Sequence, residues 1–136
     1  MIRRAGLAVL VVLSLVLVGG TGAVAGDVRV EKVVFVAQQS GQWAVHTTLR
    51  HADAGWEHYA DAWRVVQEDG AELGLRTLFH PHETEQPFTR SLQGVKIPEG
   101  VGVVYVEAHD KVHGWAADRV RVELEEVSGE RFTVKR

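Results

Sequence analysis

Apolar and polar residues alternate with a period of two along most of this chain, and this pattern constrains the fold more than any other feature. Near the C-terminus, for example, Val120, Val122 and Leu124 alternate with Arg121 and Glu123. Alternation of this kind puts apolar side chains on one face of a strand and polar side chains on the other. No stretch shows a convincing helical period, so we expect an all-β protein.

Turn-forming residues separate the alternating segments at short intervals, as at Asp69-Gly70. About seven short strands at this spacing predict an immunoglobulin-like two-sheet β-sandwich of antiparallel strands, with a jelly roll or a small barrel as alternatives. Trp63, near the middle of the third segment, fits the core tryptophan of that sandwich. We expect strands at residues 28–37, 42–50, 61–67, 72–79, 88–94, 101–108 and 117–127, with 131–136 as a short extra strand or a tail.

Residues 1–25 have the pattern of a cleaved secretory signal peptide. Two arginines are followed by an apolar run at 7–18, and Ala23–Ala25 supplies small residues before Gly26. The apolar run is shorter than the roughly 20 residues of a membrane span, although an uncleaved N-terminal anchor is an alternative. We predict a single domain at 26–136, a periplasmic or secreted location, and no stable membrane anchor after cleavage.

The composition narrows the classes of function. The formal net charge is −3, and Arg3 and Arg4 lie in the predicted signal, so the mature chain is more acidic still. Proteins that bind nucleic acid or anionic membranes need a basic patch, and these partners are therefore not expected. The chain has no cysteine and its one methionine is Met1. Disulfides, a lipid acceptor after the signal, and soft sulfur ligands for Cu(I) or Fe–S clusters are consequently not expected.

Three predicted connections are rich in histidine: HADAGWEHYA (51–60), HPHETEQP (80–87) and HDKVHGWA (109–116). If each strand crosses the sandwich and the next one returns, these connections share one end. The short turns QQSG, EDGA and KIPEG share the other end. All histidines except His46 fall in the first set. Loops on a rigid scaffold are a common place for function, so we expect one shared site at that end.

Histidine with carboxylate suits Zn²⁺, Cu²⁺ or Ni²⁺. Histidines two apart, as in HPH, project to the same side of an extended segment. No spacing matches a known metal fingerprint, so histidines that only hydrogen-bond their own loops are the competing interpretation. The predicted ligands are His80, His82, His109 and His113, with His51 and His58 as further ligands and Asp110, Asp53 and Glu83 orienting the rings.

Two other functions compete with metal binding. Trp56, Tyr59 and Trp115 offer aromatic surface for a metal-free module that binds a partner protein or small ligand. A hydrolase using Ser91 or Thr84 ranks third, because no nucleophile-elbow pattern is present. We therefore predict a non-enzymatic exported protein that binds Zn²⁺ or Cu²⁺, and we predict no catalytic residue.

The motifs HADAGWEHYADAW, HPHETEQPFTRSL and AHDKVHGW resemble those of a family of small exported proteins of proteobacterial type to which no activity is assigned. The resemblance covers roughly residues 33–122. It implies a secreted, immunoglobulin-like, single-domain protein, periplasmic in a Gram-negative bacterium. It implies no reaction, and no catalytic residue is carried over from it.

Overall fold

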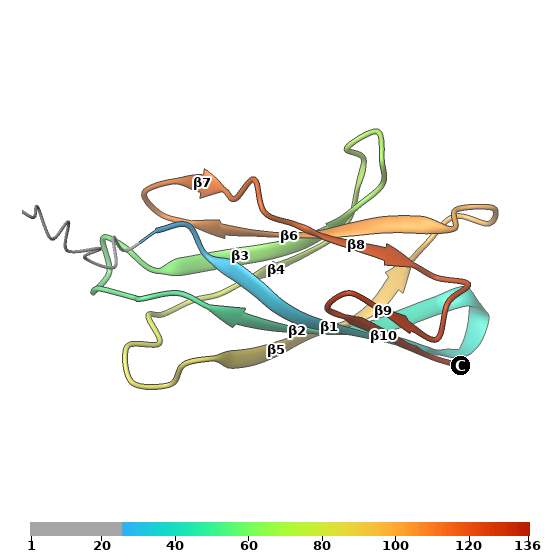
Figure 1. The fold of residues 1–136 in the computed structure, drawn as a ribbon, viewed down its shortest axis with the longest axis horizontal. Helices are drawn as coiled ribbons and strands as arrows, with labels where there is room; N and C mark the ends of the chain where they lie inside the picture. Colours follow the sequence, from blue (N-terminus) through green and yellow to red (C-terminus); the bar gives the residue numbers. More distant parts are fainter. Residues whose placement is uncertain (1–25) are drawn as a thin grey trace, which may run out of the picture.

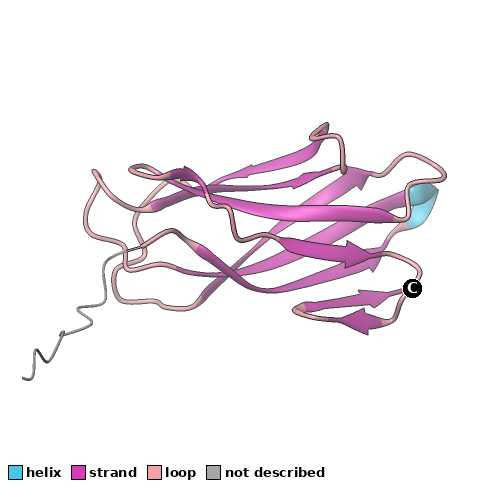
Figure 2. Cartoon of the chain, turned by 45° about the horizontal axis from the view of Figure 1, so that its top comes forward, coloured by secondary structure: helices cyan, strands magenta, loops and turns pink. Residues whose placement is uncertain are grey.

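The computed structural model describes residues 26–136. The predicted signal peptide at 1–25 lies outside the described residues. The described part is a two-layer β-sandwich with one short 3-10 helix, η1 (Gln39–Gly41) (Figure 2). Within residues 26–136, no helix has both the length and the apolar character needed to cross a membrane.

The two sheets of the sandwich each contain five strands (Figure 1). The first sheet has the order β5-β2-β1-β10-β9, and in the second the order is β4-β3-β6-β7 with β8 also paired to β6. The first sheet consists of β1 (Arg29–Ala37), β2 (Gln42–Arg50), β5 (Phe88–Lys96), β9 (Ser128–Gly129) and β10 (Phe132–Lys135). The second consists of β3 (Ala60–Val66), β4 (Glu72–Thr77), β6 (Val103–Asp110), β7 (Gly114–Trp115) and β8 (Val120–Glu123). The predicted all-β sandwich is confirmed.

The alternating pattern explains the core between the sheets. In β6, Val104, Val106 and Ala108 are fully buried, whereas the residues between them are only partly buried. Trp63 of β3 is also fully buried, as the sequence predicted. Phe35 of β1 packs edge-on against Trp43 of β2, with ring centroids 6.1 Å apart. Apolar residues from both sheets thus fill one continuous core.

The C-terminal part differs from the sequence prediction. The segment predicted as one strand at 117–127 contains only β8, and β7 forms before it. Asp118, which lies between β7 and β8, binds Arg131 through two short contacts. This stretch is therefore a loop held by the Asp118–Arg131 pair and does not continue the strand. The 131–136 segment does form a strand, β10, but it pairs parallel with β1, which breaks the expected antiparallel pattern.

Strand β6 ends later than predicted, and this affects the site. The expected strand stopped at Ala108, but β6 continues through His109 and Asp110. Both residues keep the alternation, so Asp110 is fully buried and His109 is only partly buried. Neighbouring side chains in a strand point to opposite faces. His109 and Asp110 therefore face different sides of the sheet.

The predicted arrangement of loops is confirmed. The β2–β3, β4–β5 and β6–β7 connections gather at one end of the sandwich, at the left in Figure 1. Hydrogen bonds join them: the His51 N–H donates to the Gln86 side chain at 3.0 Å, and the Lys111 N–H donates to the Tyr59 carbonyl at 3.1 Å. Most of the predicted site residues lie in or beside these loops.

We predict that Trp63→Ala lowers the free energy of unfolding by about 3–5 kcal/mol, because it leaves a large cavity between the sheets. Chemical denaturation measures the change. Trp56→Ala is the matched control, since this tryptophan is 66% exposed, and it should cost about 1 kcal/mol or less. Equal losses for the two variants would contradict the assignment of Trp63 to the core.

Candidate metal site

A buried carboxylate, Asp53, holds two of the loops together. Its side chain is fully buried. It accepts hydrogen bonds from the backbone N–H of Ala60 at 3.0 Å and from that of His82 at 2.7 Å. It also lies 2.6 Å from Nδ1 of His51. The β2–β3 and β4–β5 loops are therefore fixed to one another through this single side chain.

The contact with Asp53 sets the orientation of the His51 ring. A carboxylate only accepts, so Nδ1 of His51 donates its proton to Asp53. In the neutral ring this leaves Nε2 with a free lone pair. The His51 side chain is 1% exposed, and Nε2 has no hydrogen-bond partner in residues 26–136. A buried polar atom in this state is uncommon in folded proteins.

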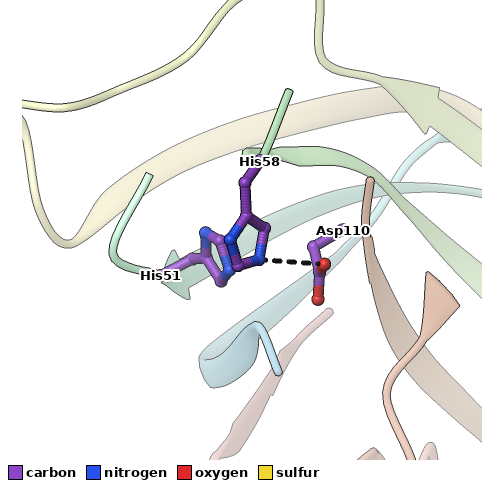
Figure 3. A group of neighbouring side chains, drawn as sticks. All are labelled: His51, His58 and Asp110. Atoms are coloured by element: carbon purple, nitrogen blue, oxygen red, sulfur yellow. Dashed lines mark ion pairs between the residues drawn. The ribbon is translucent and has the colours of Figure 1, made fainter. Parts of the chain in front are cut away.

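His58 and Asp110 lie beside the His51 ring (Figure 3). The His51 and His58 rings are 4.8 Å apart between centroids. Nε2 of His58 is 3.3 Å from Oδ1 of Asp110, yet it is buried and lacks hydrogen-bond geometry toward any described atom (Figure 3). One ligand atom from each of these three residues lies within 4.8 Å of the other two. We call this set the inner group.

Asp110 is suited to carry the negative charge of the inner group. Burial by itself would raise its pKa, but three donors outweigh that effect. The backbone N–H groups of His113 and Val112 donate to Oδ1 at 2.8 and 2.9 Å, and the His113 ring adds a further bond. The pKa of Asp110 is consequently lowered below its ordinary value. At neutral pH this residue is a buried carboxylate anion.

A second set of possible ligands shares Asp110. Nδ1 of His113 is 3.0 Å from Oδ1 of Asp110 and 3.7 Å from Oδ1 of Asp27. These three residues again place one ligand atom each within 4.8 Å of the others. We call them the outer group, because Asp27 and His113 are exposed. The His58 and His113 rings are 5.2 Å apart, so the two groups are adjacent.

The inner group has dimensions that a small cation can use. Zn²⁺ binds imidazole nitrogen and carboxylate oxygen at about 2.0–2.2 Å, so a tetrahedral ion separates its ligand atoms by roughly 3.3 Å. The distance from Nε2 of His58 to Oδ1 of Asp110 is 3.3 Å. His51 contributes a ligand atom that lies within 4.8 Å of both. Two imidazoles and one carboxylate also match the ligand types that Zn²⁺, Cu²⁺ and Ni²⁺ accept.

His80 and His82 lie next to each other but have other contacts. Their rings are 4.5 Å apart. His82 stacks on Phe88 at 4.0 Å, and its Nε2 accepts a hydrogen bond from Arg90 at 2.9 Å. His80 is exposed, with Nδ1 near the Pro81 carbonyl. The structure does not place either ring in the inner or the outer group, and the same holds for Glu83, which accepts from the Gly55 N–H.

His109 lies on the other face of the sheet from Asp110. Its Nδ1 bonds to Asp61, and its ring meets the edge of Trp115 with centroids 4.9 Å apart. Arg64 covers the Trp115 ring, with its guanidinium carbon 3.8 Å from the ring centroid. The sequence predicted that His109 and His113 share one ion, but the structure does not bring the two rings together. The two belong to opposite sides of the second sheet.

The three aromatic residues predicted to bind a partner differ in exposure. Tyr59 is 6% exposed, and Trp115 is partly buried beneath Arg64. Trp56 is 66% exposed and meets Tyr59 edge-on at 5.8 Å. It lines an open groove of about 380 Å³ with Gly55, His80, Pro81, Glu83 and Thr84. Only Trp56 of the three presents a free aromatic surface.

Ser91, considered as a hydrolase nucleophile, pairs with a histidine that is far from the loop end. Its Oγ bonds to Nδ1 of His46 between neighbouring strands β5 and β2. Within residues 26–136, no carboxylate bonds to His46, so the third member of a triad is not in place. Thr84 lies on the rim of the Trp56 groove. The pair at Ser91 is a cross-strand contact on the outer face of the first sheet.

The sequence interpretation missed two features. Asp27 was not considered, because nothing in the sequence indicates that the start of β1 passes the β6–β7 loop. Asp110 was predicted to orient the rings, whereas its oxygen lies among the possible ligand atoms of both groups. The second feature had a signal in the sequence: continuing the alternation of Val104, Val106 and Ala108 makes Asp110 an inward-facing residue.

Comparison with known proteins gives one informative similarity. The chain is 43% identical over 102 residues to a protein named "Putative lipoprotein" from Halomicrobium mukohataei. The aligned part covers 73% of this chain and 50% of that protein, so the chain spans about half the length of the curated relative it matches. No family model matches the sequence. No solved structure matches it either.

We predict that Asp53→Ala lowers the free energy of unfolding by about 3 kcal/mol or more. Removing this carboxylate leaves three donors without an acceptor, and each buried unpaired donor costs about 1–3 kcal/mol. Denaturant unfolding in the presence of EDTA measures the change without any contribution from metal. Glu57→Ala, in the same loop and exposed, should stay within about 0.5 kcal/mol of wild type. A similarly small loss for Asp53→Ala would contradict its role as the link between loops.

We also predict that His82 makes the fold sensitive to acid. Burial, and then the charge of Arg90, lower the pKa of His82 below its ordinary value of 6.5. The unfolded chain therefore binds this proton more readily, and stability falls as the pH drops through about 6.5 toward the lowered pKa of the fold. Between pH 7.5 and 5, wild type should lose more stability than His82→Gln.

His80→Gln is the matched control for this pH dependence, because His80 is the exposed neighbour of His82. It should retain most of the acid sensitivity of wild type. Thermal unfolding at a series of pH values, again with EDTA, measures all three proteins. The prediction is wrong if wild type and His82→Gln lose the same stability on acidification.

Proposed function

We propose that this chain is an exported β-sandwich protein that binds a divalent transition metal, Zn²⁺ in the first instance, through His51, His58 and Asp110. Export is supported by the signal-like residues 1–25 and by the similarity to a protein that carries the name of a lipoprotein. The proposed location is the periplasm or the outside of the cell.

One observation carries the metal proposal: two buried imidazole nitrogens that lack partners face one buried carboxylate. Nε2 of His51 and Nε2 of His58 are the two atoms, and Asp110 supplies the oxygen. Leaving each nitrogen unpaired costs about 1–3 kcal/mol. A bound cation would satisfy both lone pairs and the carboxylate charge at once. Nδ1 of His82 is also buried and unpaired among the described residues, but it lies 4.0 Å from Asp53 and belongs to neither ligand group.

The surroundings of His51 support the same proposal. Metal-binding histidines usually donate their second ring N–H to a carboxylate, which fixes the ring and strengthens the ligand. Asp53 has this relation to His51, with 2.6 Å between the two atoms. Asp53 is itself held by two backbone donors, so the ring is oriented before any ion arrives. The sequence predicted an orienting role for Asp53, and this contact supports it.

The ligand types favour borderline metals over soft or hard ones. Two imidazoles and one carboxylate suit Zn²⁺, Cu²⁺ and Ni²⁺. The chain offers no cysteine, and its only methionine is Met1, so thiolate or thioether ligation is not available. Ca²⁺ and Mg²⁺ prefer all-oxygen sites. We assign no catalytic step to this site.

A metal-free binding module is the second candidate, and the exposure of Trp56 favours it. The indole forms one side of an open groove beside His80 and Glu83. A rigid exposed tryptophan is a frequent anchor in protein interfaces. If this were the main function, the stability of the protein would not respond to metal.

We predict that saturating Zn²⁺ stabilises the protein and that EDTA reverses the effect. An ion that binds only the folded state, at 100 times its dissociation constant, adds about 2.7 kcal/mol. His51→Ala and His58→Ala should each abolish most of the shift between EDTA and Zn²⁺. Thermal unfolding of each variant, compared with its own metal-free form, separates metal binding from any loss of intrinsic stability.

The chain provides two controls for this experiment. His109→Ala removes a histidine on the opposite face of the second sheet, and His80→Ala removes an exposed one. Both should keep the shift of wild type. A wild-type protein with the same melting temperature in Zn²⁺ and EDTA would overturn the proposed function. A shift lost in His109→Ala but kept in His51→Ala would relocate the site.

A further inference from the structure

We infer that Asp27 and His113 form an outer uptake site from which a metal ion passes to the inner group while Asp110 holds it throughout. The inference rests on the proposed function, because it concerns how an ion reaches the same buried site. Its basis is that one carboxylate belongs to two ligand groups at once. The inner group is His51, His58 and Asp110, and the outer group is Asp27, Asp110 and His113.

Exposure falls in steps along this path. The side chain of Asp27 is 53% exposed and that of His113 is 34% exposed. His58 is 18% exposed, whereas His51 is 1% exposed and Asp110 is fully buried. An ion arriving from solvent therefore meets Asp27 and His113 first. It reaches His51 only after it has lost its contact with bulk water.

Asp27 is held in position by the residue that follows it. Val28 is 1% exposed and belongs to the hydrophobic core, and β1 begins one residue later. The buried valine fixes the backbone where it passes the β6–β7 loop, and Asp27 then projects beside His113. The contact between Oδ1 of Asp27 and Nδ1 of His113, at 3.7 Å, spans two parts of the chain that are far apart in sequence.

The shared carboxylate removes a costly intermediate. Moving a divalent ion into a buried site requires it to exchange water for protein ligands, and a bare cation away from water is very unfavourable. In the outer group the ion is held by Asp27, His113 and Asp110. His58, whose ring is 5.2 Å from that of His113, then replaces one of these ligands, and His51 completes the inner site. Asp110 stays bound in both positions, so the ion is never without an anionic partner.

One proton has to move for His113 to take part. In the metal-free protein, Nδ1 of His113 lies 3.0 Å from Asp110 and donates to it. To bind the ion through Nδ1, the neutral ring transfers that proton to Nε2 through water, which leaves its charge unchanged. The exposed position of His113 gives solvent access to the ring. His51 needs no such change, because Asp53 already holds its proton on Nδ1.

This arrangement suits a protein that takes up and hands over an ion rather than one that stores it permanently. A residue that acts only on the path changes the uptake and release rates by the same factor and leaves the dissociation constant unchanged. A residue of the final site changes the dissociation constant, mostly through faster release. The two roles can therefore be separated by kinetics.

The test uses Zn²⁺ alone with the chain 26–136. Stopped-flow mixing measures uptake from dilute Zn²⁺ and release to a chromophoric chelator, and titration calorimetry gives the dissociation constant and the stoichiometry. Asp27→Asn should slow uptake about tenfold, because it removes an anionic ligand that stabilises the ion on the path, and charged groups at the mouth of a site change rates by about 10–10³. Release should slow by the same factor, and the dissociation constant should stay within about twofold. His113→Gln, as an independent variant, should also slow both rates; since this ring donates to Asp110 as well, only Asp27→Asn carries the test of the dissociation constant.

The control is Glu57→Gln, which removes one exposed negative charge from the β2–β3 loop without touching either group. It should leave both rates at the wild-type values. Wild-type rates for Asp27→Asn and His113→Gln would overturn the uptake site but leave the proposed function standing. A weaker dissociation constant for Asp27→Asn through faster release alone, or two bound ions per chain, would also overturn it. Absence of Zn²⁺ binding by wild type would instead remove the proposed function itself.

Discussion

The loop end of this sandwich depends on the buried carboxylate of Asp53. It accepts hydrogen bonds from the backbones of the two longest histidine-rich loops, at Ala60 and His82, and it holds the His51 ring. A buried charge is costly unless it is paired and fully hydrogen-bonded. Because its donors come from separate parts of the chain, the cost is offset only when the loops meet. The same contacts that close the loops therefore also present Nε2 of His51 to the interior.

The strand pairing of β6 supplies the other half of the arrangement. The inward-facing positions of this strand end in Asp110 instead of another apolar residue, which puts an anion at the edge of the core. Backbone donors from the turn after it keep the pKa of this carboxyl low. His58, from the opposite loop, then faces the anion. The binding groups thus combine a rigid strand residue with loop residues that Asp53 has fixed.

The sequence predicted the sandwich and the shared loop end because both follow from short-range patterns. Alternation locates the strands, and counting their reversals assigns each loop to an end. The ligand set was harder to predict, because it depends on the face each side chain takes at the last residues of a strand. A strand that ends two residues later than expected moved His109 to the outer face and Asp110 to the inner one. Asp27 could not be found this way, since its contact with His113 joins distant segments.

Histidine content alone was a poor guide to the composition of the site. His80, His82 and His109 have partners of their own, at Pro81, Arg90 and Asp61. A possible ligand differs from a structural histidine in having a free ring nitrogen close to other ligand atoms, and both properties depend on three-dimensional contacts. The parallel pairing of β10 with β1 was likewise not predicted from the sequence, because the two strands lie at opposite ends of the chain.

The most direct test of this account is a crystal structure of the Zn²⁺-soaked protein with anomalous scattering measured at the zinc edge. The account predicts one strong anomalous peak about 2.0–2.2 Å from Nε2 of His51, Nε2 of His58 and a carboxylate oxygen of Asp110. A peak at His80, His82 or His109, with the inner group unchanged and unbound, would contradict it.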